Sequence, residues 1–353
     1  MLRLRRFYDP GNDVKTSTIP YRLILFGSAW LLGMFLLVPV DYEWTLFLRR
    51  HRIAWFARWM AQSLFEGDSL GGGDPVIFFL LLVALAYLSA WKKGPASRFY
   101  AWRPHLGFIL VTAMTNSIMM VHSLKWVMGR ARPSYVVKGL LPFSDWFKFG
   151  PQFLTEGAYR GSLPSGHTAQ VFILMTLAYL LLLSPPRFKH QRLLGWAWGG
   201  FSLLFTLLMG ISRCMRLSHW FSDIAFAMGM SWILMHVIYY HLLRIPDQES
   251  YYRRMGHFPG RPGAWEIRLC LPLFGAVAGG TAFMLGIRAF LLGAKWIWPA
   301  VFLPAGTLMT AYFALKSVQF TKRARICFEG VPGRMDDEAR SDGCDPGSNP
   351  NNS

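Results

Sequence analysis

Eight apolar stretches, each long enough to cross a lipid bilayer, constrain the fold of this chain more than any other feature. A membrane-spanning helix needs about 20 mostly apolar residues. Such stretches lie near residues 21–40, 75–91, 106–127, 167–184, 193–211, 220–243, 267–290 and 298–315. Backbone polar groups must be paired within hydrocarbon, so each stretch is expected to be a helix. We therefore predict an all-α fold, a polytopic membrane helix bundle.

Composition and charge agree with a membrane protein rather than a nucleic-acid-binding one. Hydrophobic residues make up 53% of the chain and charged residues only 16%, below the usual quarter of soluble domains. The net charge of +18 would suggest a nucleic-acid partner in a soluble protein. Here Lys and Arg cluster between the apolar stretches, which favours anionic lipid headgroups or membrane topology as the cause. We expect no nucleic-acid partner.

The charge distribution also predicts an orientation. If the N-terminus is cytoplasmic and eight spans alternate, most of the 37 Lys and Arg residues fall on the cytoplasmic side, as the positive-inside rule requires. The division expected is a cytoplasmic N-terminal segment (1–20), a six-span core (21–245), a connecting segment (246–266), an additional transmembrane hairpin (267–316) and a cytoplasmic, disordered tail (317–353).

Two segments between the spans are rich in aromatic residues. Residues 42–69 mix arginines with aromatics, which is typical of an amphipathic helix in the membrane interface; a partly buried helix outside the membrane is an equal alternative. The loop 138–163 either packs over a site or anchors in the interface. Its aromatic residues are Phe143, Trp146, Phe147, Phe149, Phe153 and Tyr159.

The first chemical motif is Lys125-x6-Arg132-Pro133, at the outer end of the third span. A spacing of seven is two helical turns, so Lys125 and Arg132 are expected on one helix face. Arg132 could grip two oxygens of an oxyanion such as phosphate, with Lys125 as a point charge. Basic residues at a span end also serve simply as interfacial anchors.

The second motif is Pro164-Ser165-Gly166-His167, just before the fourth span. Ser165 is a candidate N-cap residue, and the helix start would present backbone N–H groups to an anion. Gly166 allows close approach of the backbone. His167 would lie in the first turn, where it could protonate a leaving oxygen. An ordinary capped helix start is the alternative.

The third motif is Ser212-Arg213-x5-His219-x3-Asp223, between the fifth and sixth spans. On a helix, His219 and Asp223 would be neighbours on one face, and Asp223 could orient the His219 ring. Arg213 would add a third phosphate contact. A structural His–Asp pair is the alternative, although an Asp in the first turn of a membrane helix is costly without a partner.

In the eight-span topology all three motifs fall on the outer side of the membrane. Together they resemble the signature of the type 2 phosphatidic acid phosphatase superfamily, in its membrane-bound lipid phosphatase branch: Lys-x6-Arg-Pro, Pro-Ser-Gly-His and Ser-Arg-x5-His-x3-Asp. The resemblance covers about residues 20–245, and the last two spans depart from the common pattern. The stretch 129–133, followed by Pro142-Phe143, is similar to lipid A phosphatases.

The resemblance implies a metal-independent lipid phosphatase without a cofactor. His219 is then the nucleophile that forms a phosphohistidine, and His167 is the general acid and base. Asp223 orients the nucleophile. The phosphate-binding residues implied are Lys125, Arg132, Ser165, Gly166 and Arg213.

The substrate expected is a membrane lipid phosphate or pyrophosphate: lipid A, undecaprenyl pyrophosphate, phosphatidylglycerophosphate or phosphatidic acid. An alternative is a phosphotransferase that passes the phosphoryl group to an acceptor other than water, and a second is a non-catalytic lipid-binding or transport protein. A basic membrane protein with an outward-facing site, whose first apolar stretch is expected to stay in the membrane as a span, fits the inner membrane of a bacterium. The site would then face the periplasm.

Overall fold

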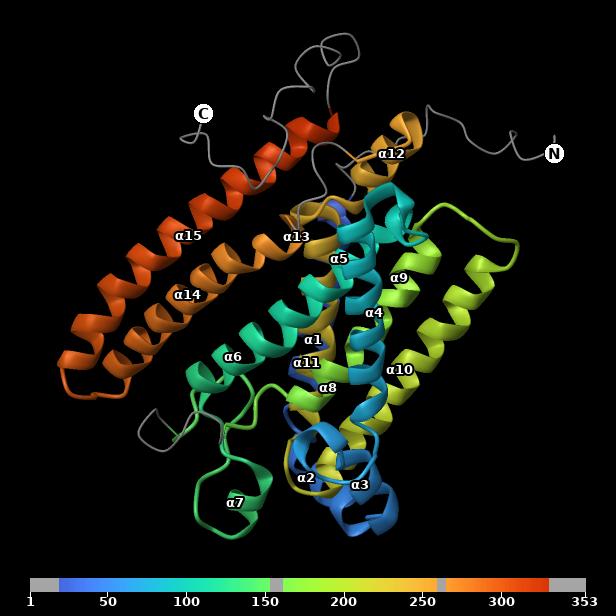
Figure 1. The fold of residues 1–353 in the computed structure, drawn as a ribbon. Coiled ribbons are helices and arrows are strands. Elements are labelled where there is room, and N and C mark those ends of the chain that lie inside the picture. Colours follow the sequence, from blue (N-terminus) through green and yellow to red (C-terminus); the bar gives the residue numbers. More distant parts are fainter. Residues whose placement is uncertain (1–18, 153–160, 259–264, 330–353) are drawn as a thin grey trace.

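The computed structural model describes residues 19–152, 161–258 and 265–329, and within them all regular structure is helical (Figure 1). In chain order the helices are α1 (Ile19–Leu36), α2 (Asp41–Arg50), α3 (Ala54–Ala61), η2 (Leu64–Glu66), α4 (Asp74–Lys93), η3 (Gly94–Ala96), η4 (Tyr100–Trp102), α5 (Arg103–Ala113), η5 (Met114–Met120), α6 (Val121–Met128), α7 (Pro133–Val137), α8 (Gly166–Val171), η8 (Phe172–Leu174), α9 (Met175–Leu183), α10 (Gln191–Met215), α11 (Phe221–Val237), η9 (Ile238–Leu242), α12 (Ile245–Met255), α13 (Trp265–Arg268), α14 (Cys270–Leu291) and α15 (Ile297–Glu329).

Seven helical runs in the described residues are long and apolar enough to cross a membrane. An eighth span results if α1 and α2 count as one, although the two helices are bent by 70° at the break between them. Each apolar stretch of the sequence coincides with a helical run, so the prediction of an all-α membrane bundle is confirmed. The chain is an integral membrane protein.

The third span lies at the centre of the bundle and is built from α5, η5 and α6 (Figure 1). Phe108, Ile109 and Val111 are buried on it. Its middle section, η5, is a π-helix that carries the buried Asn116. The Asn116 amide donates to the Ala169 carbonyl at 3.0 Å and to the Ser231 hydroxyl at 2.9 Å. Interhelical hydrogen bonds of this kind hold spans together inside a bilayer, because an apolar side chain there has an apolar environment whether it contacts protein or lipid.

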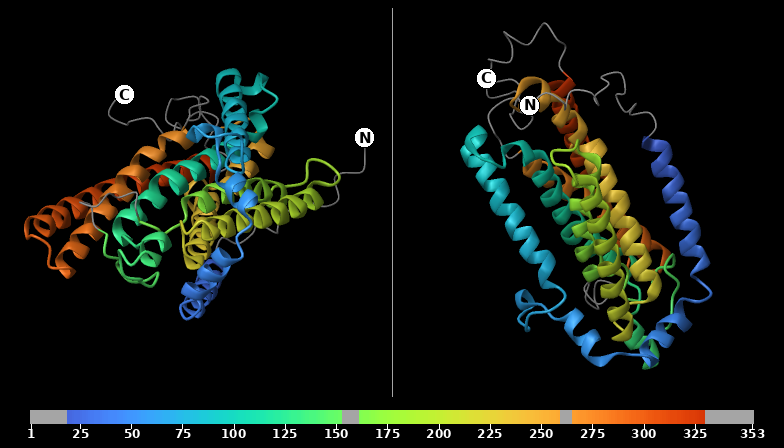
Figure 2. Two further views of the ribbon diagram at one scale, coloured as in Figure 1. Left: turned by 90° about the horizontal axis from the view of Figure 1, so that it is seen from below. Right: turned by 90° about the vertical axis from the view of Figure 1, so that its right-hand side faces the viewer.

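Helices α1 and α4 lie on opposite sides of the central helices (Figure 2). The aromatic segment after α1 forms α2, α3 and the turn η2, with Trp44, Trp55 and Trp59 exposed and Ala57 buried. These helices pack against α10.

The turn η2 is fixed by the first residue of α4. The Asp74 carboxylate accepts hydrogen bonds from the Ser63 hydroxyl at 2.8 Å and from the backbone N–H groups of Leu64 and Gly71 at 2.9 and 2.7 Å. A side chain at Gly71 would meet the Trp59 carbonyl at 2.5 Å. The close return of the chain therefore requires glycine, and it places Glu66 at the site described below.

Helices α14 and α15 form an antiparallel hairpin beside α6 (Figures 1 and 2). Glycines allow this close packing: a side chain at Gly279 would lie 2.5 Å from the Thr310 backbone nitrogen, and one at Gly286 would lie 2.9 Å from Leu303. Helix α15 runs to Glu329, past the expected start of the tail at residue 317. The connecting segment 246–266 contains most of α12 and the start of α13.

Residues 1–18 of the expected N-terminal segment and residues 330–353 of the expected tail lie outside the described residues.

Candidate active site

The three motifs meet at one end of the bundle, where α6 and α10 end and α8 and α11 begin (Figure 1). Backbone hydrogen bonds join them directly. The Ser165 N–H donates to the Asp223 carbonyl at 3.3 Å, and the Ser162 N–H donates to the Arg130 carbonyl at 2.8 Å. Segments far apart in the sequence therefore form one continuous framework, as the common side of the three motifs predicted.

His219 is 2% exposed and its Nδ1 lies 2.7 Å from the Ser162 carbonyl oxygen. A carbonyl oxygen can only accept a hydrogen bond, so Nδ1 carries the proton and donates it. In a neutral ring Nε2 is then the nitrogen with a free electron pair. Burial lowers the pKa of His219 to about 3, with a further contribution from the positive charges of Lys125 and Arg213, while Asp223 opposes the change. His219 is therefore neutral at neutral pH.

Asp223 contacts His219 differently from the expected arrangement on one helix. Helix α11 begins at Phe221, so His219 lies in the turn before it, and Nδ1 is 3.5 Å from Asp223 Oδ2. The same Oδ2 accepts the Trp220 backbone N–H at 2.9 Å, as an acidic residue in a capping box does. The Ser162 carbonyl is thus the nearer partner of the His219 ring.

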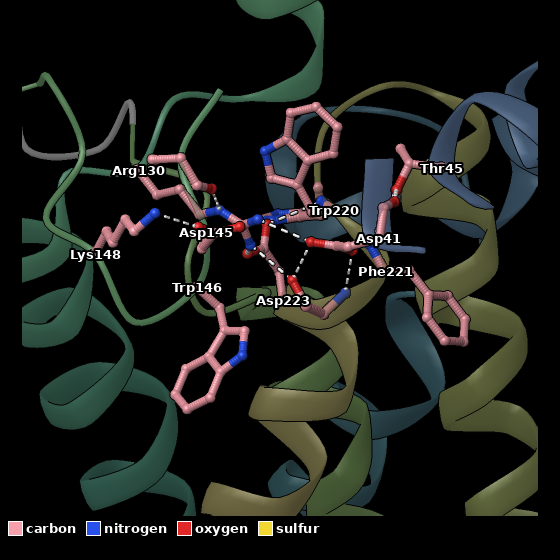
Figure 3. A network of polar contacts seen from close by, with 12 residues as sticks. Asp41, Thr45, Arg130, Asp145, Trp146, Lys148, Trp220, Phe221 and Asp223 are labelled. Atoms are coloured by element: carbon pink, nitrogen blue, oxygen red, sulfur yellow. Dashed lines mark hydrogen bonds and ion pairs between the residues drawn. The ribbon is translucent and has the colours of Figure 1, made fainter. Parts of the chain in front are cut away.

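Arg130 connects Asp223 to α2, and its side chain is completely buried (Figure 3). Its guanidinium donates to Asp223 Oδ1 at 2.7 Å and to Asp41 Oδ2 at 2.8 Å. It also donates to the Ser222 hydroxyl at 2.7 Å and to the Ser144 carbonyl at 2.8 Å. One arginine therefore neutralises two buried carboxylates behind the site.

Aromatic rings enclose this guanidinium. Its carbon lies 5.5 Å from the ring centres of both Phe143 and Trp220, within cation–π range. Trp146 from the same loop is buried, and its indole N–H donates to the Met34 carbonyl at 3.0 Å. The described part of the loop 138–163 thus packs against the protein beside the site. Phe153 and Tyr159 of that loop lie outside the described residues.

His167 is the second residue of α8, and its Nε2 lies 3.5 Å from Glu66 Oε1 in η2. The hydrogen-bonding contact with His167 lowers the pKa of Glu66, although partial burial opposes this effect. Arg213 also lies close enough to lower the pKa of Glu66 by its charge. Glu66 is 54% exposed, so it joins the site from the water-facing side.

The cations do not share one helix face, so the expected geometry of Lys125 and Arg132 is wrong. Helix α6 ends at Met128, because Gly129 adopts a left-handed conformation with φ of 53°. Arg132 lies beyond it, at the N-cap of α7. Lys125 remains within electrostatic range of both Arg132 and Arg213, so the three cations gather through the fold rather than through helical spacing.

The second motif places its glycine at ordinary contact distance from α6. A methyl group placed on Gly166 would lie 3.7 Å from the Lys125 ammonium and 3.4 Å from Val121. Ser165 takes the N-cap position of α8, as expected, but its hydroxyl pairs with the Thr168 hydroxyl at 2.8 Å instead of with the backbone.

Sequence reasoning missed four residues that hold this site together: Asp41, Glu66, Arg130 and Ser162. A lone Asp directly after an apolar span is a signal that a partner exists, yet its partner is 89 residues away. Ser162 acts through its backbone carbonyl, which carries no sequence signal.

Residues 106–245 match the family model of the PAP2 superfamily. Comparison with curated proteins gave no match, and comparison with solved structures gave none either.

Proposed function

We propose that this chain hydrolyses a phosphate ester or pyrophosphate on a membrane lipid through a phosphohistidine on His219, because residues 106–245 match the model of the PAP2 superfamily, whose members are phosphatases. The observation that carries the proposal is the hydrogen bond from His219 Nδ1 to the Ser162 carbonyl. This bond fixes the tautomer with the electron pair on Nε2, the form a histidine nucleophile requires.

In the first step, Nε2 of His219 attacks the phosphorus atom. A nitrogen–phosphorus bond forms, and the bond from phosphorus to the lipid oxygen breaks. His167 gives its proton to that oxygen. Since Nε2 of His167 faces Glu66, Nδ1 is the nitrogen that serves the leaving group, and the Glu66 carboxylate stabilises the protonated ring.

In the second step, His167 accepts a proton from water, and the resulting hydroxide oxygen bonds to phosphorus as the nitrogen–phosphorus bond breaks. Inorganic phosphate leaves and His219 returns to its neutral state. The positive charge that His219 carries in the intermediate is stabilised by Asp223, whose Oδ2 lies 3.5 Å from the ring.

The phosphoryl oxygens are held by Lys125, Arg132, Arg213, the Ser165 hydroxyl and the Gly166 backbone. Phosphoryl transfer depends mainly on positioning and on charge stabilisation. A set of fixed cations supplies both, so the reaction proposed needs no metal ion.

The membrane setting supports a lipid as substrate. The motif residues lie at the ends of helices that are long and apolar enough to span a bilayer, so the reacting phosphate is at headgroup depth. Lipid A, undecaprenyl pyrophosphate, phosphatidylglycerophosphate and phosphatidic acid all present a phosphate there.

The expected orientation places this end in the periplasm of a bacterial inner membrane. The opposite end carries many exposed cations, including Lys92, Lys93, Lys189 and Arg253, as the positive-inside rule requires of a cytoplasmic end. A membrane-impermeant thiol reagent tests this in a cysteine-free background: Arg216→Cys should react from outside intact cells and Lys189→Cys should not. The reverse pattern would overturn the orientation.

The nucleophile is tested by rapid acid-free quenching with phosphatidic acid labelled with ³²P in its phosphate. The wild-type protein should carry an acid-labile, base-stable label, and His219→Ala should carry none. His190→Ala is the matched control, because His190 is exposed at the opposite end of the bundle. Asp223→Asn should label more slowly. Full turnover by His219→Ala would exclude this nucleophile, and label that leaves only when an alcohol acceptor is supplied would indicate a phosphotransferase.

A further inference from the structure

A pocket of about 240 Å³ lies between the third span and the C-terminal hairpin. One wall is the face of η5 and α6 that carries Ile118, Met119 and Trp126. The other wall is α14, from Phe274 to Leu285, with Phe302 of α15 closing one side. All of these residues belong to helices that are long and apolar enough to span the membrane.

The lining of the pocket is chemically uneven. Most of its wall is hydrocarbon-like, as at Ile118, Phe274, Val277 and Ala278, and three polar residues also line it: His122, Ser123 and Thr281. At the end nearer the site it is bordered by Trp126, whose indole N–H is buried without an acceptor among the residues that the structure describes. A buried donor without an acceptor is costly, about 1–3 kcal/mol. The pocket therefore suits a molecule that is apolar over most of its length and has a hydrogen-bond acceptor at one end.

Arg288 of α14 connects the Trp126 end of this pocket to the loop beside the site. Its buried guanidinium donates to the Trp126 carbonyl at 3.0 Å, and also to the carbonyls of Gly150 and Gln152. Trp126 directly follows Lys125 on α6. The phosphate-binding lysine and the buried indole N–H therefore lie on neighbouring faces of α6, and the apolar pocket lies on the face of the indole.

Acyl lipids combine three matching groups: a phosphate, an ester or amide carbonyl, and a hydrocarbon chain. We propose that the pocket between α6 and α14 binds an acyl chain of the lipid substrate, with the chain's carbonyl oxygen accepting the Trp126 indole N–H. This inference rests on the proposed function and deepens it, because it assigns the C-terminal hairpin a part in recognising carbonyl-linked chains.

The volume fits part of a chain rather than a whole one. An apolar cavity of about 150 Å³ holds a benzene molecule, which has six carbon atoms. By the same ratio, about 240 Å³ accommodates roughly nine or ten carbon atoms. The rest of a longer chain would extend into the surrounding lipid.

Filling the pocket tests its occupant. Ala278→Phe places a ring inside the pocket, whereas Gly280→Phe places the same ring on the same helix where a side chain meets no atom within 4 Å. With long-chain phosphatidic acid in mixed micelles, Ala278→Phe should raise KM about 5- to 150-fold, the range that overpacking by 1–3 kcal/mol implies. With p-nitrophenyl phosphate, which has no chain, kcat/KM should stay within about twofold. Gly280→Phe should change neither.

The indole contact is tested with matched lipids. Trp126→Phe should raise KM for ester-linked diacyl phosphate but not for the ether-linked dialkyl phosphate, which lacks the carbonyl. Equal changes for both lipids, or unchanged KM with Ala278→Phe, would overturn the proposed subsite. Absence of hydrolysis of every phosphate by the wild-type protein would instead contradict the proposed function, so the two failures are distinguishable.

Discussion

Replacing Arg130 by Met is the sharpest perturbation of the framework behind the site. The side chain is completely buried, and its guanidinium is the partner of two carboxylates, those of Asp41 and Asp223, at 2.8 and 2.7 Å. Met fills similar space without the charge. The substitution therefore leaves two buried negative charges facing each other across the position of the lost guanidinium.

The expected loss in the free energy of unfolding depends on the hydrogen bonds that each carboxylate retains. Asp41 still accepts hydrogen bonds from the Ser222 backbone and hydroxyl at 2.8 and 2.5 Å, and Asp223 still accepts the Trp220 N–H. Removing one partner of a buried ion pair typically costs about 3–5 kcal/mol. Two carboxylates lose their partner, but we expect a total loss of about 3–5 kcal/mol rather than twice that amount, because the remaining donors stabilise both carboxylates.

Thermal and denaturant unfolding of the detergent-solubilised full chain measures this loss. Lys148→Met is the matched control: its ammonium lies 2.7 Å from Asp145 in the neighbouring loop, but it is 61% exposed, and exposed pairs contribute about 0–1 kcal/mol. Adding Asp41→Asn to Arg130→Met should restore part of the stability by removing one of the unpaired charges. If Arg130→Met is no more destabilising than Lys148→Met, the framework does not depend on this arginine.

Three further outcomes follow from the site. Because burial holds the pKa of His219 at about 3, this proposed nucleophile stays neutral as the pH falls through 6.5. The value of kcat/KM, corrected for substrate ionisation, should therefore show no loss centred at that pH, and such a loss would contradict the neutral buried ring. Glu66→Gln removes the negative charge beside His167, so the protonated form of this proposed general acid becomes less stable. The alkaline limb of the kcat profile should then move to lower pH, by less than about one unit since Glu66 is half exposed; an unmoved limb would remove Glu66 from the proposed mechanism. Arg288→Leu leaves three backbone carbonyls without this donor and should lower the free energy of unfolding by about 2–5 kcal/mol. Lys295→Leu, exposed in the same hairpin, should leave the free energy of unfolding unchanged. Equal effects of the two substitutions would show that the buried contacts of Arg288 are unimportant.

The spans and motifs could be predicted from the sequence because their signals are local. Twenty apolar residues predict a membrane helix wherever they occur, and the fixed spacings around His167 and His219 identify their segments without knowledge of the fold. The prediction of one continuous helix through Lys125 and Arg132 was wrong, because Gly129 between them adopts a left-handed conformation that ends α6.

The supporting contacts could not be predicted because they depend on long-range packing. Asp41 and Arg130 are 89 residues apart, and Arg288 reaches Gln152 across 136 residues. Nothing near any of these residues in the sequence specifies which partner it meets. The same holds for Glu66, which is an unremarkable acidic residue in a polar loop until the turn fixed by Asp74 brings it to His167.

The buried guanidinium of Arg288 also decides how this protein can be shortened. The family match ends at residue 245, which invites truncation at that point to obtain a smaller enzyme. Such a chain would lose the donor that caps the α6 carbonyl next to Lys125, and a match that begins at residue 106 likewise leaves out Asp41 and Glu66. The stretch that matches the family model is therefore smaller than the stretch that must fold together, and a workable minimal protein has to retain both flanks.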